Sequence, residues 1–141
     1  MGVLIGPASS RNPRHPGWPA ELGPLPSRAG AVRLRPLRRR DGAAWRRLRL
    51  RDRELIERWD ATSPLSWTER HSPAAWRAAR AALGWAARRG TCLPFAVIVD
   101  DEFVGQVTLG GIQRGSVSSA WVGYWVSSEM TGHGVATGAV A

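Results

Sequence analysis

The chain is short and strongly basic. It has 141 residues, with 20 basic against 11 acidic side chains and a formal charge of +9, and every basic residue is Arg. A chain of this length predicts one small domain. Because nucleic-acid-binding chains normally use both cations, the absence of Lys indicates the codon bias of a GC-rich genome as well as function.

Composition excludes several classes of protein. The sequence contains no apolar run of the ~18 residues that a transmembrane helix needs, so we expect no membrane partner. A single cysteine, Cys92, excludes an intramolecular disulfide and a Cys-based metal framework, and it suits a reducing cytoplasm. The three histidines, at positions 15, 71 and 133, are not at ligand spacing, so no metal is expected.

The first 30 residues differ from the rest. They are rich in Pro and Gly and lack a periodic apolar pattern, which predicts an extended arm over residues 1–30. Trp18, Leu22 and Leu25 leave open the alternative that this arm docks against the folded body. From residue 32, apolar positions alternate with Arg, which predicts a half-buried strand ending before Pro36.

Two helices are predicted next. Asp41 offers an N-cap, and apolar residues recur at helical spacing as far as Trp59, which indicates an amphipathic helix of about five turns. Residues 60–71 break the period and are predicted to be a loop. Ser72 as N-cap and Pro73 at the first helical position begin a second helix, which Gly90 closes.

The second half of the chain is predicted to form three strands followed by the start of a helix. Residues 93–99 are nearly all apolar, as in a strand covered on both faces, and an acidic turn connects them to a second strand over residues 103–109. A third strand is predicted over residues 120–126, before a helix that begins at residue 135. The order of elements predicts an α/β fold of the α+β type, with a mixed sheet of mostly antiparallel strands and two helices after the first strand.

The turn between the last strand and the last helix carries the strongest chemical signal. Gly132 and Gly134 lack Cβ atoms, so backbone can approach an oxygen-rich ligand closely, and free N–H groups at a helix start can hold phosphate. No Lys-Ser or Lys-Thr follows the glycines, which excludes a P-loop. A plain strand-to-helix turn is the alternative interpretation.

At this point residues 31–141 resemble the GNAT superfamily of acetyl-coenzyme A dependent N-acetyltransferases, and within it the ribosomal-protein-alanine type. The resemblance is carried by the first strand with Asp41, the hairpin over residues 97–109, Gly123-Tyr124-Trp125-Val126 and Thr131-Gly132-His133-Gly134-Val135-Ala136. The superfamily motif Q/R-x-x-G-x-G/A falls on the last of these segments, with Thr131 departing from its first position.

The resemblance implies a coenzyme site and its chemistry. A bulge at Trp125–Ser127 would splay the strand from its next neighbour and leave backbone groups to bind the pantetheine arm. The N–H of Val126 would donate to the thioester oxygen as negative charge develops there. The expected coenzyme-binding residues are Trp125, Val126, Thr131, Gly132, His133, Gly134, Val135, Ala136 and Thr137, with acetyl-CoA as cosubstrate.

The sequence does not identify the general base that accepts the proton of the acceptor amine. Asp60, Glu69 and Glu129 are candidate bases, each with a solvated surface carboxylate as the alternative, and His133 is expected to face solvent near the phosphates. Tyr124 is expected in the core or in a pocket wall, and Cys92 as a small buried hydrophobe.

The remaining aromatic and basic residues allow both structural and functional interpretations. Trp59, Trp67 and Trp125 fit either an acceptor pocket or the core, whereas Trp45, Trp76 and Trp121 are expected in the core. The arginines of residues 38–40 and of the first helix form a solvated face or a patch for acidic partners.

The expected function is acetyl transfer from acetyl-CoA to an amine such as the N-terminal amine of a ribosomal protein. Two alternatives stay open. The chain stops within the helix that binds the diphosphate, which suggests an incomplete, inactive domain, and its charge allows a basic RNA-binding module. Core-like aromatic spacing and interrupting acidic residues argue against direct nucleic-acid binding.

Overall fold

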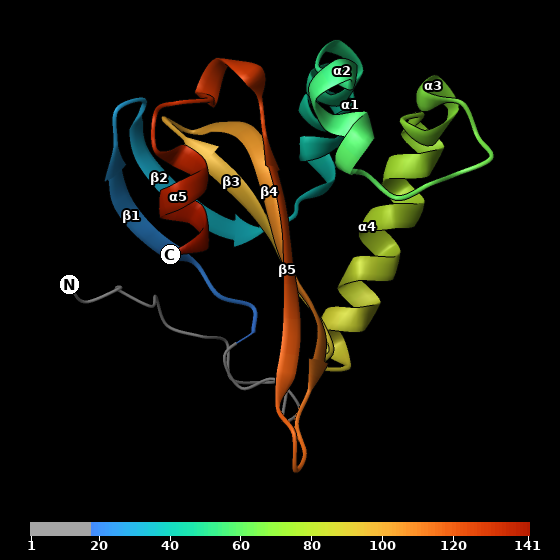
Figure 1. Ribbon diagram of the computed structural model, residues 1–141, viewed down its shortest axis with the longest axis vertical. Coiled ribbons are helices and arrows are strands. Elements are labelled where there is room, and N and C mark those ends of the chain that lie inside the picture. The colour runs from blue at the N-terminus through green and yellow to red at the C-terminus, as the bar shows by residue number, and fades with distance from the viewer. Residues whose placement is uncertain (1–17) are drawn as a thin grey trace.

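Each strand of the single sheet pairs with the strand next to it in the chain. The computed structural model describes residues 18–141. Within them an antiparallel sheet of order β1-β2-β3-β4-β5 comprises Leu22–Ser27, Gly30–Pro36, Leu93–Val99, Glu102–Gln113 and Ser119–Val126 (Figure 1). The mostly antiparallel α/β fold expected from the sequence is confirmed.

Helices interrupt the chain after β2 and follow β5. These are α1 (Gly42–Arg51), α2 (Arg53–Ile56), α3 (Trp67–Arg70), α4 (Pro73–Arg88) and α5 (Val135–Val140), with 3-10 turns η1 (Arg39–Asp41), η2 (Glu57–Trp59) and η3 (Ser128–Met130). Ser72 caps α4 by accepting from the backbone N–H of Ala75 at 3.0 Å, and Gly90 after its end has a φ of 78°. Both ends of the second helix are therefore confirmed.

Strand β3 lies at the centre and contributes to both apolar cores. Val97 and Val99 pack in one cluster with Val135 and Ala139 of α5, while Ala96 and Ile98 pack in another with Trp45 of α1 and Trp76 of α4. All four β3 residues are at most 5% exposed. Side chains of a strand alternate between faces, so helices must cover both sides, as predicted from the apolar run. The expectation of Trp45 and Trp76 in the core is confirmed.

The predicted extended arm is wrong for residues 22–27, which form β1. Its pairing with β2 places Leu25 opposite Val32 and Ser27 opposite Gly30. Trp18 is 8% exposed and meets Phe95 edge-on, with ring centroids 5.2 Å apart, so the docking alternative is correct for this residue. Hairpin pairing and one aromatic anchor order a segment whose prolines hide its strand pattern.

The predicted five-turn helix is wrong because it breaks at Asp52. This residue is 6% exposed, and its carboxylate accepts hydrogen bonds from the backbone N–H and hydroxyl of Ser128, both at 2.8 Å. A buried carboxylate needs such partners, and reaching them takes the backbone out of helical geometry. Asp41 is not the predicted side-chain N-cap either, since its carboxylate binds the Arg35 guanidinium through two bonds of 2.8 Å.

The predicted loop over residues 60–71 contains the short helix α3. Ser66 accepts from the backbone N–H of Glu69 at 3.2 Å, and the Glu69 carboxylate accepts from the N–H of Ser66 at 2.8 Å. This reciprocal pair is a capping box, which stabilises a single turn that has no helical period of its own.

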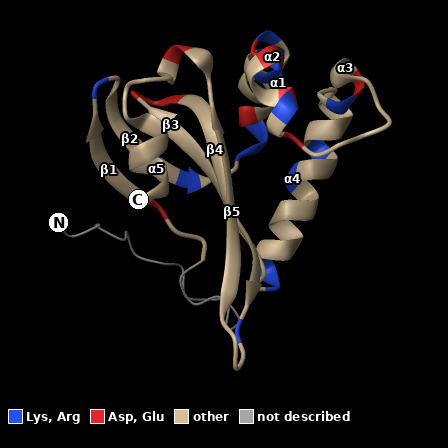
Figure 2. Cartoon of the chain, in the orientation of Figure 1, with Lys and Arg blue, Asp and Glu red and all other residues tan. Residues whose placement is uncertain are grey.

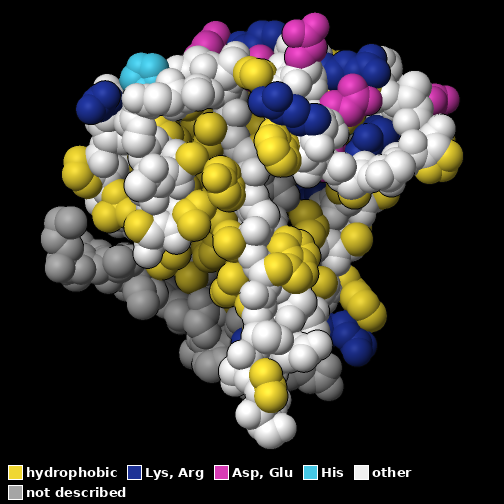
Figure 3. All heavy atoms as spheres, viewed as in Figure 1, with side chains coloured by type: hydrophobic (Ala, Val, Ile, Leu, Met, Phe, Trp, Pro, Cys, Tyr) yellow, Lys and Arg dark blue, Asp and Glu magenta, His cyan; other side chains and the backbone are white. Residues whose placement is uncertain are grey.

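Strand β5 is more exposed than predicted. Trp121, expected in the core, is 58% exposed and lies across Gly110 and Gly111 of β4. Within the described residues β5 pairs with β4 alone, so its other edge is open. Apolar side chains gather over α5 and β5 in Figure 3, whereas charged side chains gather around α1 to α3. No described helix has the length and apolarity to cross a membrane.

The approach of β4 to β5 at Gly105 yields a stability prediction. A Cβ atom at Gly105 would lie 2.3 Å from the carbonyl oxygen of Trp125 and 2.9 Å from the Cα of Val126. Gly105→Ala should therefore lower the free energy of unfolding by about 1–3 kcal/mol, measured by urea denaturation. Gly115→Ala is the control, because no described atom other than those of the adjacent residues lies within 4 Å of its Cβ position. Equal stability of the two variants would contradict the close packing.

Candidate active site

A pocket of about 810 Å³ lies between the β1–β2 turn, the exposed face of β5 and the loop that leads into α5. Its lining comprises Pro26, Ser27, Arg28, Tyr124, Val126, Met130, Thr131, Gly132, His133, Gly134, Val135, Ala136 and Thr137. Segments more than 90 residues apart in the sequence therefore meet around one cavity.

The loop before α5, residues 131–134, contains Gly132 and Gly134 and is called the glycine loop below. It presents backbone without side chains to this pocket. Gly132 and Gly134 both have a φ of 77°, a left-handed conformation that side chains with a Cβ rarely adopt. Apart from the adjacent residues of the chain, no described atom lies within 4 Å of the Cβ position of either glycine, so the space beside each is open. Val135 and Ala139 are buried against the sheet and anchor α5, while residues 131–134 stay exposed.

The end of β5 turns backbone groups toward the open edge. Val126 lies opposite Gly105, and the N–H of Ser127 donates to the carbonyl oxygen of Val104 at 2.7 Å. In an antiparallel ladder, a bond between these two residues makes the neighbouring pair, Val126 and Gly105, a non-hydrogen-bonded pair. The N–H and C=O of Val126 therefore point away from β4. Because hydrogen-bonded and non-hydrogen-bonded pairs alternate along the strand, the N–H and C=O of Tyr124 and Val122 also point away from β4.

The bulge expected at Trp125–Ser127 is wrong for the pairing with β4. The register runs without a shift from Gly105 to Gly110, and the irregularity lies between Gly110 and Gln113. Ordinary strand alternation is therefore sufficient to free the Val126 N–H.

All the predicted coenzyme residues except Trp125 line the pocket. Trp125 lies on the opposite face of β5, against Phe103 and the Arg49 guanidinium. Tyr124 is 58% exposed, so the pocket-wall alternative is correct and the core alternative is wrong. Sequence reasoning missed Met130 and the β1–β2 turn at Pro26, Ser27 and Arg28. The sequence signalled only the far side of that turn, through the alternation that begins at Val32, because residues 22–27 show no apolar alternation.

The candidate bases are engaged elsewhere, and none of them lines the pocket. Asp60 forms ion pairs with Arg49 and Arg70, and Glu69 caps α3. Hydrogen bonds from Ser66 hold the pKa of Glu69 below its usual value. Glu129 pairs with Arg51 at 3.0 Å. His133 lines the pocket and is exposed, with Nδ1 2.9 Å from the carbonyl oxygen of Thr131.

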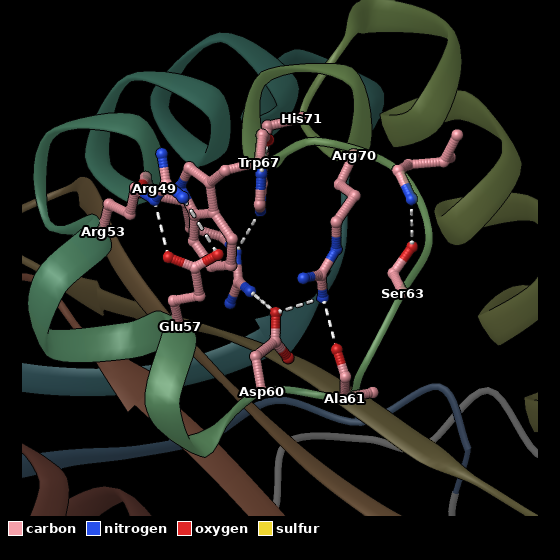
Figure 4. A network of polar contacts seen from close by, with 10 residues as sticks. Arg49, Arg53, Glu57, Asp60, Ala61, Ser63, Trp67, Arg70 and His71 are labelled. Atoms are coloured by element: carbon pink, nitrogen blue, oxygen red, sulfur yellow. Dashed lines mark hydrogen bonds and ion pairs between the residues drawn. The ribbon is translucent and has the colours of Figure 1, made fainter.

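The buried guanidinium of Arg49 connects α1 with α3 and with β5, and Figure 4 shows it with Asp60 and Trp67. The Arg49 guanidinium lies 5.2–5.8 Å from the ring centroids of Trp45, Trp67 and Trp125, and it binds Asp60. Burial lowers the pKa of Arg49 and Asp60 opposes that shift. Stacking and an ion pair together compensate for the desolvation of the guanidinium.

His71 completes this cluster as a neutral ring. Its Nε2 accepts from Arg49 Nε at 2.7 Å, so its other nitrogen, Nδ1, is the donor to the carbonyl oxygen of Trp67 at 2.6 Å. Burial lowers the pKa of His71, opposed by the bond to Trp67. Trp67 is 3% exposed and belongs to the core, whereas Trp59 is 80% exposed and does not line this pocket.

The described residues contain no group of three His, Cys, Asp or Glu side chains that could hold a metal ion. Cys92 is 5% exposed, and burial raises the pKa of its thiol, which keeps it protonated. The expectation of a small buried hydrophobe is therefore confirmed.

Comparison with known proteins places these features in a family. Residues 31–141 match the family model described as the acetyltransferase (GNAT) domain. The fold is similar to Mycobacterium smegmatis RimJ in complex with CoA-disulfide, with 47% identity, a TM-score of 0.85 and coverage of 88% of this chain and 59% of that one. A comparison with curated proteins gave no match.

Two more distant structures share the fold. The ribosomal-protein-S5-alanine acetyltransferase from Vibrio fischeri has 21% identity, a TM-score of 0.66 and coverage of 77% of this chain and 59% of that one. Microcin C7 self immunity acetyltransferase MccE, in complex with acetyl-CoA and AMP, has 14% identity, a TM-score of 0.65 and coverage of 79% and 62%. The chain thus spans about three fifths of the length of each of these proteins.

The buried His71 predicts a pH dependence of stability. Because folding lowers its pKa, the unfolded chain binds more protons as pH falls below the ordinary value of about 6.5. The free energy of unfolding should therefore fall between pH 7 and pH 5 and keep falling until the folded-state pKa is passed. Urea denaturation at each pH measures this loss.

His71→Gln removes the titrating ring and should flatten this part of the profile. His133→Gln is the control, because that ring is exposed, and it should follow the unmodified chain. Parallel profiles for all three proteins would show that another group causes the loss.

Proposed function

Because the chain belongs to the GNAT acetyltransferase family, we propose that it binds acetyl-coenzyme A and transfers the acetyl group to an amine. The observation that carries the proposal is one continuous pocket that joins the glycine loop to the open edge of β5 at Val126. The coenzyme supplies the activated acetyl group as a thioester, and the protein supplies binding and polar stabilisation.

The lining fits a phosphorylated coenzyme. The bare backbone at Gly132 and Gly134 admits a diphosphate at close range, and the described lining contains no carboxylate that would repel it. The apolar side chains of Val126 and Met130 fit the pantetheine arm. Backbone N–H groups near residues 132–136 would hold the phosphate oxygens.

Val126 is proposed as the oxyanion donor. Its N–H points to the open edge of β5, where an extended ligand can lie like an added strand. A fixed donor at the thioester oxygen stabilises the negative charge of the transition state more than the neutral substrate. The rigid pairing of β5 with β4 holds this N–H in place before the reaction.

We further propose that the acceptor is a protein N-terminal amine, of the ribosomal-protein-alanine class. Support comes from the names of two similar structures, M. smegmatis RimJ and the ribosomal-protein-S5-alanine acetyltransferase. Only a neutral amine can attack, so a water or a carboxylate must take its proton. Asp60, Glu69 and Glu129 have structural partners, which favours a water-mediated route.

The first test is coenzyme binding and turnover. Saturating acetyl-CoA should raise the Tm of the purified protein, and an alanine-initiated peptide should cause release of the coenzyme thiol. Absence of a Tm shift, together with no thiol release for any amine, would contradict the proposal.

The second test removes the single N–H of Val126. Val126→Pro leaves the ladder bonds to β4 intact, because this N–H faces the open edge, yet it should lower kcat by about 10²–10³-fold. Val122→Pro removes an equivalent edge N–H further along β5, outside the pocket lining, and should keep kcat within about threefold. Equal activity of the two variants in the thiol-release assay would exclude Val126 as the donor.

A further inference from the structure

The β1–β2 turn places a positive charge in the wall of the pocket. Arg28 lines the cavity together with the glycine loop, and its guanidinium makes no hydrogen bond or ion pair with any described residue. This differs from Arg35, Arg49, Arg51, Arg53 and Arg70, each of which is paired with a carboxylate. Figure 2 shows basic colouring at this turn and none on α5.

The position of this cation is set by the fold. The backbone N–H of Arg28 donates to the carbonyl oxygen of His133 at 3.0 Å, which ties the turn to the middle of the glycine loop. Ser27 tightens the turn, since its hydroxyl donates to the carbonyl oxygen of Gly30 at 2.7 Å and accepts from the N–H of Ala29 at 3.2 Å. The side chain of Arg28 therefore starts from a fixed point beside the loop.

The charge of the lining favours an anion. Arg28 carries the permanent charge among the described lining residues, and no Asp or Glu is among them. Glu129, which precedes the glycine loop by two residues, is paired with Arg51 and does not line the pocket. An uncompensated guanidinium beside open backbone N–H groups attracts phosphate, which its planar fork binds through two hydrogen bonds.

We propose that Arg28 binds a phosphate group of the coenzyme and sets the preference of this pocket for phosphorylated over unphosphorylated pantetheine compounds. This inference rests on the proposed function, because it assigns a residue to the same coenzyme site. The diphosphate and the 3′-phosphate share the chemistry that the guanidinium recognises, and the ligands in the test separate them.

The experiment measures the Kd of the purified protein for coenzyme A, 3′-dephospho-coenzyme A and pantetheine by calorimetry at low ionic strength. Arg28→Ala should raise the Kd for coenzyme A about tenfold and leave that for pantetheine unchanged. Arg28→Lys keeps the charge without the fork and should raise it about threefold. If the loss persists with 3′-dephospho-coenzyme A, Arg28 binds the diphosphate; if it disappears, Arg28 binds the 3′-phosphate.

Arg33→Ala is the matched control. Arg33 is exposed on β2, on the side opposite to its neighbours Val32 and Leu34, which pack in the cluster with α5, and it does not line the pocket. The substitution Arg33→Ala removes the same charge as Arg28→Ala and should keep the Kd for coenzyme A within twofold of the value for the unmodified chain.

Three results would overturn the inference. An Arg28→Ala protein that binds coenzyme A within twofold of the unmodified chain refutes the contact while leaving the proposed function intact. An equal loss for pantetheine shows that the substitution disturbs the pocket and not a phosphate contact. Failure of the unmodified chain to bind coenzyme A refutes the proposed function itself and the inference with it.

Discussion

The candidate site depends on the pairing of β5 with β4, in which Val126 faces Gly105 as a non-hydrogen-bonded pair. This register decides which N–H groups of β5 are used within the sheet and which face the open edge. A shift by one residue would exchange the two sets and turn Tyr124 and Val126 away from the pocket. Gly105 permits the close approach, because a Cβ atom there would collide with the backbone of β5.

Buried polar contacts join the helices after β2 to the end of β5. Asp52, between α1 and α2, accepts two hydrogen bonds from Ser128, and Arg49 of α1 lies over the ring of Trp125. Burial raises the pKa of Asp52, but hydrogen bonds from Arg51 and Ser128 outweigh it and lower the pKa overall. The first residues after β5 are thereby held in place, and the glycine loop starts from a fixed base.

The contacts of the individual arginines explain much of the net charge of +9. Several arginines neutralise carboxylates or stack on tryptophan, and so contribute to the fold instead of forming a general anionic-ligand surface. Arg28 is different, because the turn that carries it lies against the glycine loop and supplies no carboxylate partner. The distribution of charge, and not its sum, distinguishes the pocket from the rest of the surface.

The sequence by itself determined where β2, β3, β4 and β5 follow one another along the chain, both ends of α4 and the glycine loop, because apolar period, capping residues and glycines act through near neighbours in the chain. It did not reveal β1, the break at Asp52 or the place of Arg28, since each depends on a partner distant in sequence: β1 and Arg28 on β2 and the glycine loop, Asp52 on Ser128. The sequence also predicted Trp121 in the core, although this side chain is exposed. The apolar pattern of β5 could not show how far neighbouring elements cover it. Tertiary structure alone decided which backbone and side-chain groups share one pocket, because that requires segments brought together by the sheet.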